Sequence, residues 1–150
     1  MRCILGIISI AFLATSCASL KAPEFKSVEN VQLTKFGFNE SVFNLDLHYY
    51  NPNKASLKLR NAEGEAWVDE THLGHFIVDT LTLIPGKSDF VLPVKLQVEL
   101  AKLLKVSALA LLSGEAMVKI QGTARVGKGP VFINYPIKYE GKQQLANLLK

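Results

Sequence analysis

Residues 43–53 read FNLDLHYYNPN. Apolar and aromatic side chains occupy every second position in the first part of this stretch, at Phe43, Leu45, Leu47 and Tyr49. A period of two is typical of a β-strand with one buried face and one face in solvent, as in an antiparallel sheet. Asn51-Pro52-Asn53 then favour a turn, because proline fixes φ and asparagine tolerates unusual values of φ. The stretch therefore predicts an antiparallel strand that ends in a tight turn.

The same alternation recurs along the rest of the chain. It is clear in residues 90–98, 116–126 and 131–138, and weaker in residues 27–34, 57–69 and 74–83. Pro93 cannot donate a hydrogen bond to a neighbouring strand, so we expect its strand to lie at a sheet edge or to be bulged.

One segment follows the period of a helix. Between Glu99 and Leu112, apolar residues recur at spacings of three and four, at Leu100, Leu103, Leu104, Ala108 and Leu111. We expect this helix to cover an open end of the fold; the alternative is that it lies on a membrane, with Lys102 and Lys105 toward the headgroups. About seven strands, with the helix inserted before the last two, predict an all-β fold. The prediction is a seven-stranded antiparallel β-sandwich of the immunoglobulin or fibronectin type III kind.

The first residues have the composition of a secretory signal peptide. Arg2 precedes twelve uncharged, mostly apolar residues, 3–14, which are too few to span a bilayer but fit a signal-peptide core. The small residues that end at Cys17 resemble the lipobox of bacterial lipoproteins, although Leu13 lies four places before the cysteine rather than three. The resemblance implies cleavage between Ser16 and Cys17 and lipidation of Cys17. The alternative is an ordinary signal peptide that leaves Cys17 as a free thiol.

These boundaries predict four parts of the chain. Residues 1–16 form the removed signal peptide, residues 17–26 a lipidated tether, residues 27–142 the β-sandwich domain and residues 143–150 a C-terminal tail.

Several short motifs occur in an order that resembles a known family. They are Tyr50-Asn51-Pro52-Asn53, Leu57, Leu59, Leu73-Gly74, Ile84-Pro85, Leu92-Pro93-Val94, the helix before Gly114, and Val118 to Gly122. From about residue 24 to about residue 141 the chain resembles the late embryogenesis abundant type 2 family, also called the water-stress and hypersensitive-response domain. The resemblance implies a seven-stranded sandwich with a short helix, a structural turn at Asn51-Pro52-Asn53 and no catalytic motif. Bacterial members are often described as desiccation-related lipoproteins.

The pair His72 and His75 is a candidate metal site, since Asp69, Glu70 and Asp79 lie close by in the sequence and imidazole and carboxylate both bind metals. However, residues three apart in an extended chain point to opposite faces, and Leu73-Gly74 has the composition of a turn. We therefore predict polar turn residues, with no metal and no other cofactor.

Other candidate residues favour binding over catalysis. Asp46 and His48 share a strand face, but no serine or cysteine nucleophile stands near them, so we predict no catalytic residue and no enzyme. Trp67 falls by parity among acidic residues, where it could mark a contact surface or be covered by the helix.

The function expected from the sequence is that of a lipid-anchored, non-catalytic module that protects against desiccation or stress, or binds a partner. We expect it in the bacterial cell envelope, on the outer membrane facing the periplasm. Alternatives are an accessory subunit of an envelope protein complex and a carrier of a small apolar ligand; Phe43, Phe90 and Tyr135 are expected to fill the core and so disfavour the carrier. The formal charge is +4, but no basic run interleaved with aromatic residues indicates nucleic-acid binding. No small-molecule substrate is identified.

Overall fold

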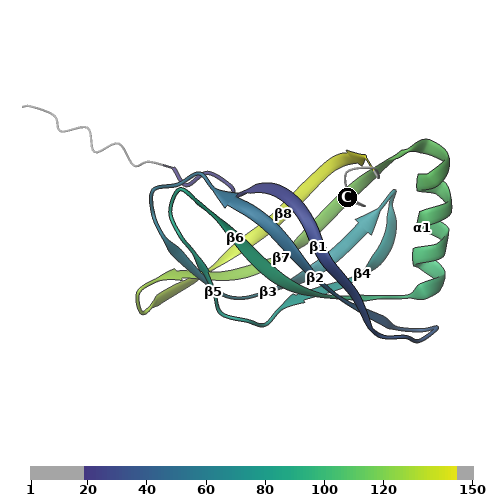
Figure 1. The fold of residues 1–150 in the computed structure, drawn as a ribbon, viewed down its shortest axis with the longest axis horizontal. Coiled ribbons are helices and arrows are strands. Elements are labelled where there is room, and N and C mark those ends of the chain that lie inside the picture. Colours follow the sequence, from purple (N-terminus) through teal and green to yellow (C-terminus); the bar gives the residue numbers. More distant parts are fainter. Residues whose placement is uncertain (1–18, 145–150) are drawn as a thin grey trace, which may run out of the picture.

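The computed structural model describes residues 19–144, without the side chains of residues 107 and 109–111. Within these residues it contains eight strands and one helix (Figure 1). Their order is β1 (Glu24–Lys35), β2 (Ser41–Asn51), β3 (Leu57–Val68), β4 (Thr71–Val78), β5 (Thr82–Ile84), β6 (Ser88–Val98), α1 (Leu100–Ser113), β7 (Glu115–Lys128) and β8 (Val131–Gln144). The predicted all-β fold, with a helix before the last two strands, is confirmed. The strand count is eight rather than seven, because residues 79–81 divide the strand predicted at 74–83 into β4 and β5.

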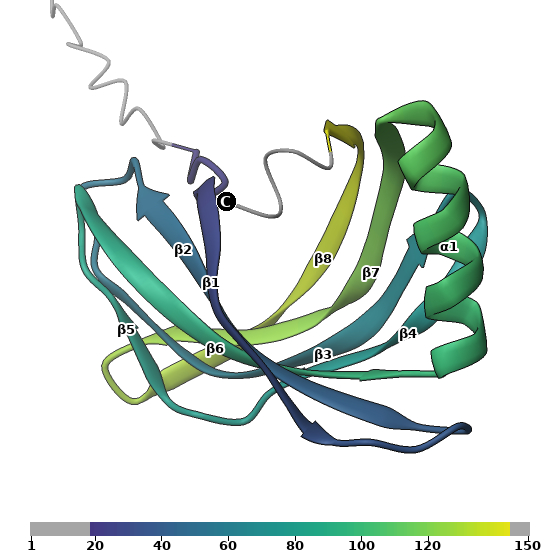
Figure 2. The same ribbon diagram turned by 45° about the vertical axis from the view of Figure 1, so that its right-hand side comes forward.

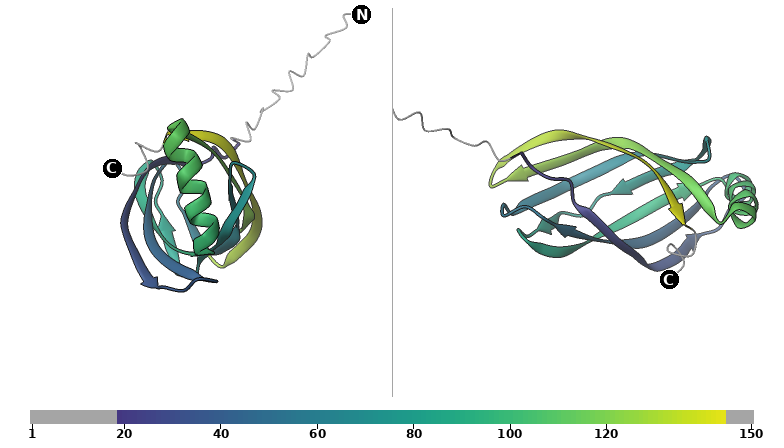
Figure 3. Two further views of the ribbon diagram at one scale, coloured as in Figure 1. Left: turned by 90° about the vertical axis from the view of Figure 1, so that its right-hand side faces the viewer. Right: turned by 90° about the horizontal axis from the view of Figure 1, so that it is seen from above.

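The strands form one antiparallel sheet in the order β1-β2-β6-β4-β3-β7-β8, with β5 paired to β3. The sheet bends so that β1 and β2 lie opposite β7 and β8, as in a sandwich (Figure 2). The pairing of β4 with β6 joins the two halves. α1 crosses one end of the bent sheet, where the sequence predicts a covering helix (Figure 3).

The core lies between the two halves, at the middle of the sheet. Its buried apolar side chains are Leu59, Ala62, Val78, Ile84, Phe90, Val94 and Ala124. Gly64 of β3 pairs with Gly122 of β7 and leaves room for the ring of Phe76. A Cβ on Gly64 would lie 2.7 Å from that ring, which is closer than packed atoms allow.

Pro93 does not lie in an edge strand, so that part of the expectation is wrong. β6 stands between β2 and β4 in the sheet. β4 pairs only with residues 95–98 of β6, so Pro93 has a paired strand on the β2 side alone. The missing N–H of Pro93 therefore interrupts no ladder toward β4.

α1 packs against the strands through a narrow stripe. Val106 is buried and packs with Val68 of β3 and Ala116 of β7. Leu104, which the periodicity places on the buried face, is exposed. The reason is that α1 contacts β4 and β7 across the end of the sheet rather than along a flat face. No helix in the described part of the chain has the length and apolar content to cross a bilayer.

Asn51 ties together the segments at the other end of the sheet. Its side chain is 1% exposed, and its Nδ2 donates to the carbonyl oxygens of Ala55 (3.1 Å) and Pro85 (3.0 Å). Its Oδ1 accepts from the backbone N–H (3.0 Å) and the side-chain Nδ2 (2.9 Å) of Asn53. Asn53 in turn donates to and accepts from the backbone of Lys21, at 2.8 Å each. The buried Asn51 amide therefore links the end of β2 to the turns before β3 and β6, and Asn53 beside it extends the network to the segment that leads into β1.

We predict that Asn51→Asp lowers the free energy of unfolding by about 3 kcal/mol at neutral pH, because a buried carboxylate would face two carbonyl oxygens without a proton to donate. Burial and these carbonyls would raise the folded-state pKa of the new carboxyl above the ordinary value of about 3.9. The loss of unfolding free energy is therefore complete at pH values above the folded-state pKa of the new carboxyl. It shrinks as the pH falls toward about 3.9. Denaturant titration across this pH range measures it. Asn39→Asp, at an exposed position, is the control, and an equal loss in both variants would contradict the structural role of Asn51.

Candidate functional site

A tight turn joins β3 to β4 at the end of the sheet covered by α1. Asp69 and Glu70 form this turn, with φ values of 46° and 65°. Asp69 also fixes the turn to β7, since its Oδ1 accepts from the backbone N–H of Met117 at 2.9 Å. The turn predicted at Leu73-Gly74 is therefore wrong; those two residues lie inside β4.

A β-bulge follows this turn. His72 pairs with Trp67, and Gly74 pairs with Ala66, which immediately precedes Trp67 in β3. Leu73 is thus an extra residue on β4, opposite no residue of its own on β3. A bulge of one residue shifts the alternation of the strand, so side chains three positions apart come to the same face.

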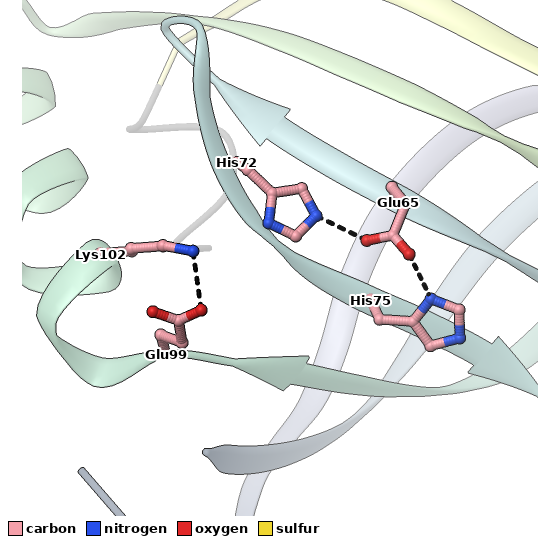
Figure 4. Close-up of polar contacts among 5 residues, drawn as sticks. All are labelled: Glu65, His72, His75, Glu99 and Lys102. Carbon is pink, nitrogen blue, oxygen red and sulfur yellow. Dashed lines mark hydrogen bonds and ion pairs between the residues drawn. The ribbon is translucent and has the colours of Figure 1, made fainter. Parts of the chain in front are cut away.

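His72 and His75 consequently lie on one face and share one carboxylate (Figure 4). His72 Nε2 lies 2.6 Å from one oxygen of Glu65, and His75 Nδ1 lies 2.8 Å from the other. The prediction of opposite faces is wrong because it assumed an unbroken strand. The hydrogen bond with His72, and to a smaller extent that with His75, holds the pKa of Glu65 below its ordinary value.

Trp67 stands beside this cluster on the outer face of β3. Its ring meets His72 edge to face, with ring centres 5.5 Å apart. Lys119 Nζ lies 5.6 Å from the centre of the indole ring, in a cation–π contact. The half-buried indole is therefore held between a histidine and a lysine.

The described residues contain no cluster of the kind that holds a metal ion. Both oxygens of Glu65 are already occupied by histidines, and no group of three or more metal-ligating side chains occurs within residues 19–144. Asp46 and His48, which share a face as predicted, have separate partners. Asp46 accepts from Asn30 at 2.8 Å, and His48 lies 3.5 Å from Glu29.

The most unusual surface is apolar and lies on the two edge strands. No pairing joins β1 to β8 in the described part of the sheet. The register places five of their apolar side chains opposite inward-facing residues of β2 and β7, yet these five are exposed. They are Phe25, Leu33, Ile133, Tyr135 and Tyr139, which we call the apolar edge face.

Ile133 and Tyr135 show the contrast most clearly. They pair with Val126 and with the buried Ala124 of β7, so they point toward the core side of the sheet. They are nevertheless 62% and 54% exposed. The expectation that Tyr135 fills the core is wrong, whereas Phe90 does fill it. The cause is topological: an inward-facing side chain on an edge strand is covered only if the opposite edge closes over it.

The two edges approach each other at one position. Tyr139 of β8 lies near Tyr49 of β2, and Phe25 of β1 meets Tyr49 edge to face at 5.7 Å. Burial raises the pKa of the Tyr49 hydroxyl, and the neighbouring Tyr139 hydroxyl raises it further. Phe25 and Tyr139, which belong to the apolar edge face on different edge strands, therefore both influence Tyr49 of β2.

A hollow of about 190 Å³ lies at the end of the sheet opposite α1. Its lining includes Leu57 of β3, Leu83 of β5 and Gly127 of β7. No titratable group other than lysine lines it. The predicted cleavage and lipidation residues, Ser16 and Cys17, and the predicted tail beyond residue 144 lie outside the described residues.

The fold and the site define an all-β, sandwich-like domain with one end covered by a helix. The model of the family described as late embryogenesis abundant protein matches residues 46–141, which is more than half of the chain. The chain belongs to this family, and the resemblance seen in the sequence is confirmed. The family is generally non-enzymatic, and membership indicates a stress-related or binding module.

Solved structures give distant likenesses. The solution structure of AT1g01470 from Arabidopsis thaliana is 18% identical, with a TM-score of 0.49 over 89% of each chain. A crystal structure of a protein from Archaeoglobus fulgidus is 8% identical, with a TM-score of 0.47 over 81% of this chain and 97% of that one. A solution structure of a late embryogenesis abundant (LEA) protein is 16% identical, with a TM-score of 0.39 over 89% of this chain and 77% of that one. No curated protein matches.

We predict that Glu65→Gln destabilises the protein by at most about 1 kcal/mol near neutral pH, because the carboxylate is partly exposed and solvent screens its interactions. A folded-state pKa below the ordinary 4.5 means that ionised Glu65 stabilises the fold above that value. This stabilisation is lost as the pH falls through the folded-state pKa. The difference between wild type and variant should therefore shrink in denaturant titrations as the pH falls below about 4.5. Glu63→Gln, two residues away on the same face, is the control; a difference that persists at low pH would refute the assignment.

Proposed function

We propose that this chain is a lipid-anchored, non-catalytic binding module of the bacterial cell envelope that holds an apolar ligand along its apolar edge face. The observation that carries the proposal is the exposure of inward-facing apolar side chains on β1 and β8. Soluble proteins rarely leave contiguous apolar surface uncovered unless it binds something.

An acyl chain suits the dimensions of this surface. From Val131 to Tyr139, β8 presents apolar side chains over roughly 26 Å of extended strand. The hydrocarbon core of a bilayer is about 30 Å thick, so the acyl chains of one leaflet span about 15 Å. A single acyl chain is therefore shorter than the apolar stretch of β8 and can lie along it. The hydroxyls of Tyr135 and Tyr139 give this otherwise apolar surface polar groups that suit a lipid headgroup.

The lipid anchor is proposed from the sequence before residue 18. The signal-peptide composition and Cys17 support it, and two or more acyl chains would hold the domain stably on a membrane. The backbone of Lys21 forms hydrogen bonds with the Asn53 side chain, so the folded domain begins only a few residues after the proposed anchor at Cys17. We place the protein on the outer membrane facing the periplasm, in a role under water loss or envelope stress.

We expect the intact mass of the membrane-extracted protein to match a chain that starts at Cys17 and carries acyl groups. Cys17→Ala should abolish the added mass and release the protein from the membrane fraction, because the variant lacks the thiol to which lipid attaches. A mature wild-type chain without acyl mass would refute the anchor and leave the proposed ligand surface untouched.

We predict that Ile133→Asp weakens binding of a fluorescent fatty acid by at least tenfold, because it places a charge where the acyl chain lies. Equilibrium titration of the purified protein measures the affinity. Asn134→Asp adds the same charge on the opposite face of β8 and is the matched control. Equal affinity of Ile133→Asp and wild type would rule out the edge face as the ligand site.

A second candidate function is that of an accessory subunit of an envelope complex. β1 and β8 each have one unpaired backbone edge, and such edges can add a strand from another protein. On β8, however, Pro136 removes a donor, and Lys138, Glu140 and Lys142 add charge, which are devices that block edge pairing. The apolar edge face is therefore the better-supported binding surface.

A further inference from the structure

The turn between β1 and β2 carries two aromatic rings in solvent. Phe36 and Phe38 are 65% and 80% exposed. Their ring centres lie 6.1 Å apart with an angle of 62° between the planes, so they contact each other rather than the domain core. A single exposed apolar residue is ordinary, but paired rings at the apex of a turn form a contact surface.

The turn is built to hold these rings outward. The buried Ser41 hydroxyl donates to the carbonyl oxygen of Gly37 at 2.9 Å and accepts from its N–H at 3.3 Å. Lys35 and Glu40 form an ion pair of 2.9 Å across the turn. A Cβ on Gly37 would lie 2.6 Å from the Glu40 carbonyl oxygen, so the backbone closes tightly here. The rings therefore project from a preorganised loop and need no rearrangement to bind.

The turn lies at the end of the domain that also carries α1 (Figure 1). Ser41 pairs with Val98, which is two residues before α1 begins. On α1, Leu104 and Leu112 are exposed as well. Lys21, near the N-terminal end of the described chain, lies at the opposite end of the sheet, where it bonds to Asn53. One end of the domain is thus tied to the N-terminal segment, and the other carries exposed apolar side chains.

We propose that Phe36 and Phe38 insert into the surface of a lipid bilayer. The surface is convex, so a protein partner would need a pocket of matching shape, whereas a bilayer accepts any small convex apolar group. Two cations at this end of the domain are paired, Lys35 with Glu40 and Lys102 with Glu99 at 2.7 Å. Insertion therefore rests on apolar burial and does not require anionic headgroups. It depends neither on Cys17 nor on the apolar edge face.

The test uses a local probe in the full chain, because the first residues could hold the chain on vesicles by themselves. Trp67→Phe removes the single tryptophan, and Phe38→Trp then places the only indole at the turn. Phosphatidylcholine vesicles should shift the emission of this indole to shorter wavelength, and vesicles brominated on the acyl chains should quench it. Adding Phe36→Ser should weaken this partitioning about tenfold, since one ring's burial is lost.

The control is Val91→Trp in the same Trp67→Phe background, at an exposed position within β6. This indole should be neither shifted nor quenched, and circular dichroism should show every variant folded. Phe38→Trp emission that is unchanged by vesicles overturns the proposal. A shift that appears without vesicles as protein concentration rises also overturns it, because the turn would then dock on a second copy of the chain.

Discussion

The buried amide of Asn51 is the interaction on which the arrangement of the strands depends. A side chain that is 1% exposed keeps both its donors and its acceptor satisfied only if Ala55, Pro85 and Asn53 all hold their positions. Because an unpaired buried polar group costs about 1–3 kcal/mol, this geometry is selected over looser turns. Pro52 and the Asn-Pro-Asn order thus specify how β2 ends and where β3, β6 and the segment before β1 meet it.

Period-two alternation predicted the strands but not how they are placed. Each strongly alternating segment became a strand, since alternation reports only that one face is buried. The alternation predicts opposite faces for His72 and His75, which is wrong because of a bulge at Leu73 that has no clear sequence signal. The bulge brings both histidines to one carboxylate. The positive-φ turn at Asp69 and Glu70 was also missed, because Leu73-Gly74 offered a more conventional turn composition.

The apolar edge face illustrates a second limit of sequence reasoning. The sequence predicts that Tyr135 points inward and fills the core; the register confirms the inward side, but the side chain is exposed. Whether an inward side chain is covered depends on whether the opposite strand reaches it, which is a property of sheet order and curvature. Only the three-dimensional arrangement, with β1 and β8 as the two unpaired edges, revealed this surface.

β1 connects this surface to the exposed turn. Three register shifts interrupt its pairing with β2, so β1 follows β2 unevenly. Its exposed apolar residues begin with Phe25 at the end near Asn53, continue to Leu33, and lead directly into Phe36. One irregular strand therefore connects the end that holds the N-terminal segment to the apolar end beside α1. The apolar edge face, which β1 shares with the proposed ligand-binding strand β8, therefore lies between the two places where the domain is proposed to meet lipid.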